Sequence, residues 1–282
     1  MRPIISLLIA VLLAATLTAC GQGEPAPADA VPAPEPVPVE QVREDPFAAY
    51  FDLSGLSDET LDRARQVIDQ ESTQDGVTVR VSQTLGDGRS LYVAFDVIYP
   101  EQADPTEFPT VRLAKGAVDD PIQAEELPGL INSGINGAQT QENTMSYLAE
   151  FDFREPCLTG QEVSLLVEDP ATGGVYAFTW TAENEGFFAQ ADLVDQTGRT
   201  VGSAALSSFL LTLELPRTND WTHNQWTALA ETLQLLDVDG NPLQGFMGWQ
   251  GGNGVFYAQF YSPIGPGAVQ TIQAENFTGT FQ

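Results

Sequence analysis

Apolar and polar residues alternate with a period of two along most of the chain beyond residue 72. Alternation of this kind predicts strands that bury one face and expose the other. Glycine-rich turns separate the runs, and many short strands with frequent turns are typical of β-sandwiches. The predicted strands are 77–84, 90–98, 144–153, 162–167, 175–181, 187–194, 203–215, 232–238, 255–261, 269–273 and 278–281.

The stretch 76–97, GVTVRVSQTLGDGRSLYVAFDV, shows the alternation most clearly. Valines alternate with polar residues on its first arm, and the second arm repeats the pattern after the turn Gly86-Asp87-Gly88. A glycine-rich loop that binds phosphate leads into a helix, whose N-terminus is positive. Here a strand follows, and Asp87 adds a negative charge. We therefore expect the turn to join two strands of a hairpin that lays one face on a core.

The period changes to that of a helix over 57–71, SDETLDRARQVIDQE, where Ser57 is placed to cap the first turn. A second helix is predicted over 224–232. Residues 101–143 show no regular pattern, which predicts a long surface loop with an edge strand near 111–113. A loop of this length is also a place where a binding function can lie.

Together these elements predict an all-β fold of two tandem immunoglobulin-like β-sandwich domains, preceded by a short helix. Polar residues and a glycine interrupt the alternation at Asn184-Glu185-Gly186. Breaks of this kind mark domain boundaries. We therefore expect the helix and the first sandwich within 46–184 and the second sandwich within 185–282.

The first twenty residues have a composition of their own. A single basic residue, Arg2, precedes an apolar run, which is typical of a secretory signal peptide at 1–19. Leu17-Thr18-Ala19-Cys20 resembles the lipobox of bacterial lipoproteins. The resemblance implies that Cys20 is lipidated and becomes the first residue, so that lipid anchors the chain to the outer face of the bacterial cell membrane.

Residues 20–45 follow as a segment rich in proline, alanine and glutamate. Proline holds the backbone extended and removes hydrogen-bond donors. About 20 residues at about 3.1 Å each span on the order of 60 Å. We expect a stalk that holds the folded body away from the membrane.

The charge balance excludes some partners. The chain has 39 acidic and 11 basic residues, a net charge of −28. Nucleic acid and anionic lipid headgroups both require a basic surface. We expect no nucleic-acid partner, and a membrane contact through Cys20 alone.

The residue types that carry chemistry are scarce. His223 is the only histidine, and Cys157 has no cysteine partner once Cys20 is lipidated. We therefore predict no catalytic residues, no metal site and no cofactor. Asp237, Asp239 and Asn241 resemble half of a calcium loop that lacks its later glutamate, so a hairpin turn is favoured. Trp221, Trp226 and Trp249 fit a core better than a carbohydrate platform.

Three segments resemble one protein family: the hairpin at 76–97, AALSSFLLTLELP at 204–216, and GNGVFYAQFYSPIGPGAVQTIQ at 252–273. They are similar to an extracytoplasmic domain family of unknown function in Firmicutes, found on the outer part of anti-sigma-factor-like membrane proteins. The resemblance implies two β-sandwich domains and no catalytic residues. Those proteins carry a cytoplasmic segment and a transmembrane helix, whereas this chain has a signal peptide and a lipobox. We therefore do not expect direct regulation of a sigma factor.

The sequence predicts a lipid-anchored cell-surface binding or signalling-accessory module without catalysis, whose partner is a protein or an envelope component. Two alternatives stay open. One is a secreted hydrolase that uses carboxylates on envelope or dietary glycan, since acidic residues are abundant. The other is a calcium-dependent adhesion module.

Overall fold

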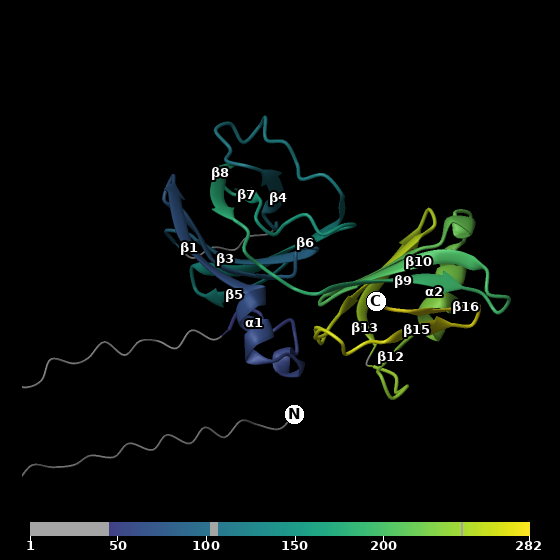
Figure 1. Cartoon of the computed structure of the whole chain (residues 1–282). Coiled ribbons are helices and arrows are strands. Elements are labelled where there is room, and N and C mark those ends of the chain that lie inside the picture. Colours follow the sequence, from purple (N-terminus) through teal and green to yellow (C-terminus); the bar gives the residue numbers. More distant parts are fainter. Residues whose placement is uncertain (1–44, 102–106, 244) are drawn as a thin grey trace, which may run out of the picture. The chain divides into compact units, whose positions relative to one another are not determined.

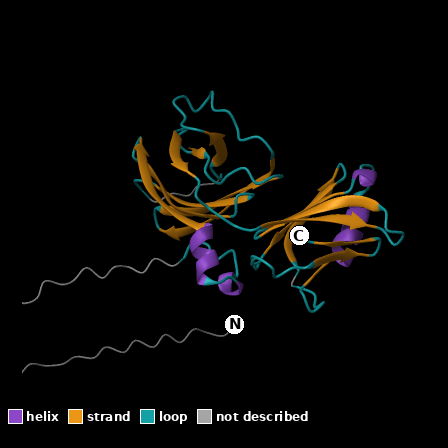
Figure 2. Ribbon diagram, in the orientation of Figure 1, coloured by secondary structure: helices purple, strands orange, loops and turns teal. Residues whose placement is uncertain are grey.

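The computed structural model describes residues 45–101, 107–243 and 245–282. The predicted signal peptide, Cys20 and nearly all of the stalk lie outside the described residues. The described part consists mainly of antiparallel strands with a few short helices (Figures 1 and 2). The all-β class predicted from the alternation is confirmed.

The first helix is shorter than predicted. A 3-10 turn, η1 (Leu53–Gly55), precedes α1 (Asp58–Ala64), and Ser57 caps α1 by accepting a hydrogen bond from the backbone N–H of Thr60 at 3.2 Å. The prediction of helix up to residue 71 is wrong. The chain becomes extended at Arg65 and continues as β1 (Arg65–Gln74), where pairing with the next strand replaces helical hydrogen bonds.

Eight strands form two sheets around the first core. The first sheet has the order β1-β2-β3-β6-β5, and the second has the order β4-β7-β8. The two sheets face each other (Figure 1). Between them lies one cluster of buried aliphatic and aromatic side chains. The strands are β2 (Val77–Gly86), β3 (Ser90–Ile98), β4 (Thr110–Lys115), β5 (Leu130–Gln141), β6 (Thr144–Phe153), β7 (Glu162–Glu168) and β8 (Val175–Thr181).

The expected hairpin is present: β2 and β3 pair antiparallel, and the turn at Asp87 joins them. The edge strand predicted near 111–113 is confirmed as β4, but the long loop predicted over 101–143 is wrong in part, because it also contains the twelve-residue strand β5. β5 does not show the alternation of apolar and polar residues, because it lies at the edge of its sheet and carries glycine and amide residues. Gly137 is required there, since a Cβ at that position would lie 2.3 Å from the ring of Tyr147.

Glutamine side chains join the first sheet to the second. Gln66, Gln70 and Gln74 recur every four residues along β1. Their amide groups donate to the backbone carbonyls of Thr181, Thr179 and Val175 on β8, at 2.8, 2.9 and 3.0 Å. The amides satisfy carbonyl groups that a further strand would otherwise bind, and they close that side of the first core.

The remaining strands form the third sheet, in the order β12-β15-β16-β9-β10-β11-β14-β13, and α2 (His223–Thr232) packs with it around a second core. The single strand predicted over 203–215 is a hairpin of two strands with Phe209 in its turn. The strands are β9 (Phe188–Val194), β10 (Thr200–Ser207), β11 (Leu210–Glu214), β12 (Gln234–Leu236), β13 (Phe246–Gly252), β14 (Val255–Phe260), β15 (Thr271–Ala274) and β16 (Phe277–Thr280). A second 3-10 turn, η2 (Pro216–Thr218), precedes α2.

We predict that the glutamine contacts stabilise the fold measurably. Replacing Gln66, Gln70 and Gln74 by alanine leaves three carbonyl groups without these donors. At about 0.5–1.5 kcal/mol for each hydrogen bond, the free energy of unfolding should fall by roughly 2–4 kcal/mol. Denaturant titration measures the change. The exposed Gln123→Ala is the control and should change it little; equal stability of the triple variant and the control would contradict the prediction.

Candidate functional site

The outer face of the first sheet, the side that faces away from the first core, carries side chains of three kinds. On β3 it carries Ser90, Tyr92, Ala94, Asp96 and Ile98, whose partners on β6 run from Asp152 back to Thr144. Along β3 and β6 these outer side chains fall into three zones. An acidic zone lies around Asp152, an apolar zone around Tyr92 and Ala94, and a polar zone around Asp96.

The apolar zone is covered. Tyr92, Ala94 and Leu148 form a buried cluster with residues of the segment before β1 and with Phe209 of the β10–β11 turn. The ring of Phe51 packs edge to face on the rings of Tyr92 and Phe209, with centroids 4.7 and 5.6 Å apart. The cover ends beside Ala94. Beyond that point the outer face is mainly polar, and Ile98 is the apolar exception on β3.

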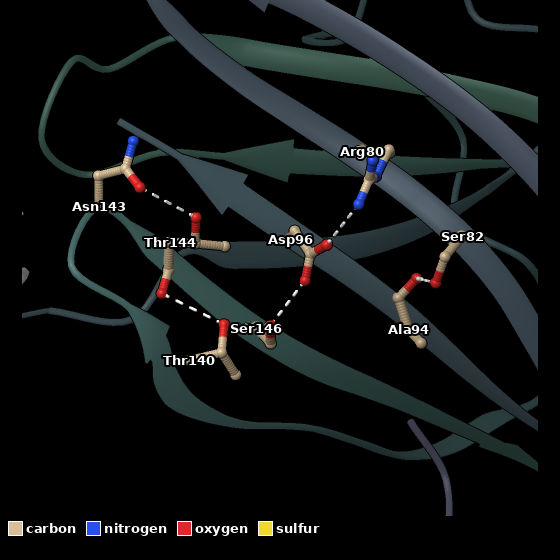
Figure 3. Close-up of polar contacts among 8 residues, drawn as sticks. All are labelled: Arg80, Ser82, Ala94, Asp96, Thr140, Asn143, Thr144 and Ser146. Carbon is tan, nitrogen blue, oxygen red and sulfur yellow. Dashed lines mark hydrogen bonds and ion pairs between the residues drawn. The ribbon is translucent and has the colours of Figure 1, made fainter. Parts of the chain in front are cut away.

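The polar zone is a ladder of side chains that crosses four strands (Figure 3). Arg80 on β2 donates to Asp96 on β3 at 3.2 Å, and Ser146 on β6 donates to the other oxygen of Asp96 at 2.7 Å. The hydroxyl of Thr140 on β5 lies 2.9 Å from that of Ser146. Each contact joins neighbouring strands. We call this set, Arg80, Asp96, Ser146 and Thr140, the polar ladder.

The ladder is ordered but accessible. The side chains of Arg80 and Asp96 are 24% and 22% exposed, and Thr140 is exposed at the sheet edge. Thr73 and Thr78 extend the same face toward β1, with their hydroxyls 2.8 Å apart. A flat row of hydroxyl, carboxylate and guanidinium groups, held by its own hydrogen bonds, can recognise a polar partner with little loss of side-chain freedom.

The acidic zone is buried and hydrogen-bonded. Glu150 and Asp152 lie two residues apart on β6, and the amide groups of Asn132 on β5 and Gln259 on β14 each donate to both carboxyl groups. Ser90 donates to Asp152 at 2.6 Å. Burial, and then the neighbouring carboxylate of Asp152, raises the pKa of Glu150 to about 7. The pair therefore holds a proton near neutral pH.

A buried arginine lies next to this zone. Arg89, in the β2–β3 turn, is fully buried and donates to the hydroxyl of Thr212 at 2.6 Å and to the carbonyl of Ala205 at 3.3 Å. Burial lowers the pKa of Arg89, and the charges of Asp87 and Asp152 oppose that shift. Asp87 accepts from the backbone N–H groups of Arg89, Ser90 and Phe209. Through these hydrogen bonds the turn attaches to the third sheet.

Trp221, Trp226 and Trp249 lie in and around the second core, whereas Trp180 belongs to the first. Trp226 is 1% exposed, and Trp221 packs edge to face on it with ring centroids 5.0 Å apart. Trp249 lies beneath His223, whose ring stacks on it at 5.6 Å. The structure thus agrees with the interpretation of Trp226 as a core residue. Trp221 also lines a cavity of about 320 Å³ between α2 and the β15–β16 turn.

The half calcium loop is a turn between β12 and β13. Asp237 accepts hydrogen bonds from the backbone N–H groups of Asp239 and Asn241 at 2.9 and 2.8 Å, and the amide of Asn241 also donates to it. These hydrogen bonds, those of Asn241 first, lower the pKa of Asp237. Within the described ranges, no three His, Cys, Asp or Glu residues gather as metal ligands would. Cys157 is half-buried against the first core, where burial raises the pKa of its thiol.

Sequence reasoning missed the polar ladder and the acidic pair. Asp96, Ser146 and Glu150 are ordinary polar positions of predicted strands, and only the pairing of β3 with β6 brings them together. Thr140 lies in the stretch predicted as a loop. One available signal was the uncharged sequence of 130–141 between acidic neighbours.

We predict that the acidic pair makes folding stability depend on pH. The pKa of Glu150 rises from an ordinary value of 4.5 to about 7, so the folded chain keeps a proton that the unfolded chain loses. Stability is therefore fully present below about pH 4.5 and falls as pH rises toward 7. Across that range this group should remove roughly 1–3 kcal/mol.

Glu150→Gln should remove this loss, because its amide can donate to Asp152 as the protonated acid does. Denaturant titrations at pH 5 and pH 8 measure the effect against Glu168→Gln, an exposed change of equal charge on β7. The same pH dependence in both variants would contradict the prediction.

Comparisons with known proteins name no family. No family model and no curated protein matches the chain. One solved structure, described as the conserved domain protein from Bacillus anthracis, is similar over 81% of this chain and 82% of its own, with 12% identity and a TM-score of 0.47. Within the described residues, no helix has the length and apolar character needed to cross a membrane.

Proposed function

We propose that this chain is a lipid-anchored, extracytoplasmic binding module without catalysis, whose body consists of two tandem immunoglobulin-like β-sandwich domains, at 46–184 and 185–282. Lipid on Cys20 attaches it to the outer face of the bacterial cell membrane, and residues 20–45 form the stalk. The partner is a protein or a polar envelope component. A role as an accessory in signalling across the envelope is compatible with this arrangement.

The polar ladder carries the proposal. It presents hydrogen-bonding groups of both kinds on an accessible sheet face, at the point where the fold's own cover of that face ends. By contrast, the strongly perturbed carboxyl group, Glu150, is 9% exposed and is bound by amides of the same chain. The exposed polar groups are thus arranged for contact, and the buried ones serve the fold.

The hydrolase alternative has one observation in its favour. A carboxyl group with a pKa of about 7 beside a second carboxyl group is what a glycosidase uses as its general acid. For Glu150 to act, the amides of Asn132 and Gln259 would have to give way to a substrate. Turnover of a glycan or peptide panel by the protein, abolished in Glu150→Gln and retained in Glu168→Gln, would support the hydrolase and contradict our proposal.

The anchor has a direct test. Lipidation joins a diacylglyceryl group to the cysteine sulfur as a thioether, so Cys20→Ser should abolish incorporation of a clickable fatty acid into the protein. The modified cysteine carries at least two chains, enough for stable anchoring. The variant should therefore leave the lipid-anchored pool, either as soluble protein or held by its uncleaved signal peptide. Labelling of Cys20→Ser as strong as that of the chain with Cys20 would contradict the lipoprotein assignment.

The binding surface has a second test. A photo-crosslinking residue at Thr73, exposed on the same outer face as the ladder, should capture a discrete partner on intact cells. Thr200, exposed at the start of β10, is the matched control position. Capture at Thr73 should weaken by about tenfold when Asp96→Ala removes the centre of the ladder, which corresponds to about 1.4 kcal/mol. Equal capture at both positions, or none, would contradict the proposal.

A further inference from the structure

β5 is the open edge of the first sheet. It pairs with β6 on one side only, and no backbone hydrogen bond joins it to any other described segment. Register shifts lie at its two ends, between Leu130 and Asn132 and between Gln139 and Gln141. The stretch 132–139 between them is regular. Such an edge presents a row of N–H and C=O groups that have no partner among the described residues.

The other described sheet edges are closed or short. β1 lies against β8 through its glutamines. β4 is flanked by the segment that contains Glu125 and Glu126, which hydrogen-bonds to Lys115 and bridges to Ala114. In the third sheet β12 has three residues, and β13 contains a register shift and contacts α2. β5 is thus the longest regular edge of the described sheets that lacks a cover.

β5 also lacks the charged residues and prolines that commonly keep an edge unpaired. Its sequence, LINSGINGAQTQ, has no charged residue and no proline, in a chain with 39 acidic and 11 basic residues. Edge strands that stay single usually carry charges or proline. Phe108 packs beside the edge on the ring of Tyr147 and is 56% exposed, and Leu130 is 37% exposed. Free backbone groups and apolar side chains therefore occur together here.

We propose that β5 is a dimerisation edge: the β5 strands of two copies pair antiparallel about a twofold axis and continue the first sheet from one copy into the other. An antiparallel strand pair is self-complementary about such an axis, so one strand can supply both sides of the contact. Arg80, Asp96 and Ser146 of the polar ladder lie on strands other than β5 and stay accessible on the sheet face in the dimer.

The charge distribution favours a second copy over a foreign segment. Most surfaces of a chain with a net charge of −28 repel a second copy, but two β5 strands bring no like charges together. A basic segment from another protein would find no acidic side chain on β5. What the edge offers is backbone pairing, the exposed amide of Asn136 and an exposed apolar contact at Phe108.

Cysteine scanning tests the contact in the full chain on intact cells. Single changes Ser133→Cys, Asn136→Cys and Ala138→Cys place thiols along β5, and Val67→Cys and Thr73→Cys place them on β1, the opposite edge of the same sheet. Under mild oxidation at least one β5 position should form covalent dimer about tenfold faster than both β1 positions, because paired strands hold the thiols within disulfide reach. The unsubstituted chain measures the background from Cys157.

A second arm uses the purified, detergent-solubilised protein. In analytical ultracentrifugation the native chain should have twice the monomer mass. The double variant Asn136→Lys/Ala138→Lys on β5 should be a monomer. The double variant Val67→Lys/Thr73→Lys on β1 should stay a dimer. Far-UV circular dichroism checks folding; if the β5 lysine variant is unfolded, the cysteine arm decides.

Monomeric native protein, or crosslinking at β5 no faster than at β1, would overturn the dimer. Adducts of the β5 cysteines with a different protein would overturn it in favour of a foreign strand. Either result leaves lipid labelling at Cys20 and capture at Thr73 as separate tests of the proposed function.

Discussion

The attachment of the β2–β3 turn to the third sheet determines much of the surface that this protein presents. Asp87 is buried, and its carboxylate accepts a backbone hydrogen bond from Phe209 as well as those of its own turn. Gly186 is required beside it, since a Cβ there would lie 2.2 Å from that of Asp87. Because this contact fixes the β10–β11 turn, the ring of Phe209 lies over Tyr92 and completes the apolar cover of the first sheet.

That cover explains why one sheet face serves three purposes. Where Phe51 and Phe209 reach, the outer positions of β3 and β6 are apolar. Where β14 reaches, they are carboxyl groups bound by Gln259 and Asn132. Where no described segment of the cover reaches, they form the polar ladder. Buried carboxyl groups cost free energy unless they are hydrogen-bonded or protonated, and the raised pKa of Glu150 reflects that cost.

The two edges of the first sheet show how side chains decide whether a strand can take a partner. On β1 the glutamines reach across to carbonyl groups of β8, so the edge is used within the fold. On β5 the amide of Asn132 donates instead to the carboxyl groups of its own sheet face, and no described strand other than β6 pairs with the β5 backbone. Similar residue types thus give a closed edge on one side and an open one on the other.

The sequence by itself determined the all-β class, the β2–β3 hairpin, the cap at Ser57 and the approximate position of α2, because these depend on local alternation, turn residues and capping. Tertiary structure alone decided that 65–74 is a strand, since its backbone pairs with β2 and its glutamine side chains donate to carbonyl groups of β8. It also decided that 130–141 is an edge strand. The polar ladder and the acidic pair depend on register between strands distant in sequence, and one-dimensional periodicity carries no information about register.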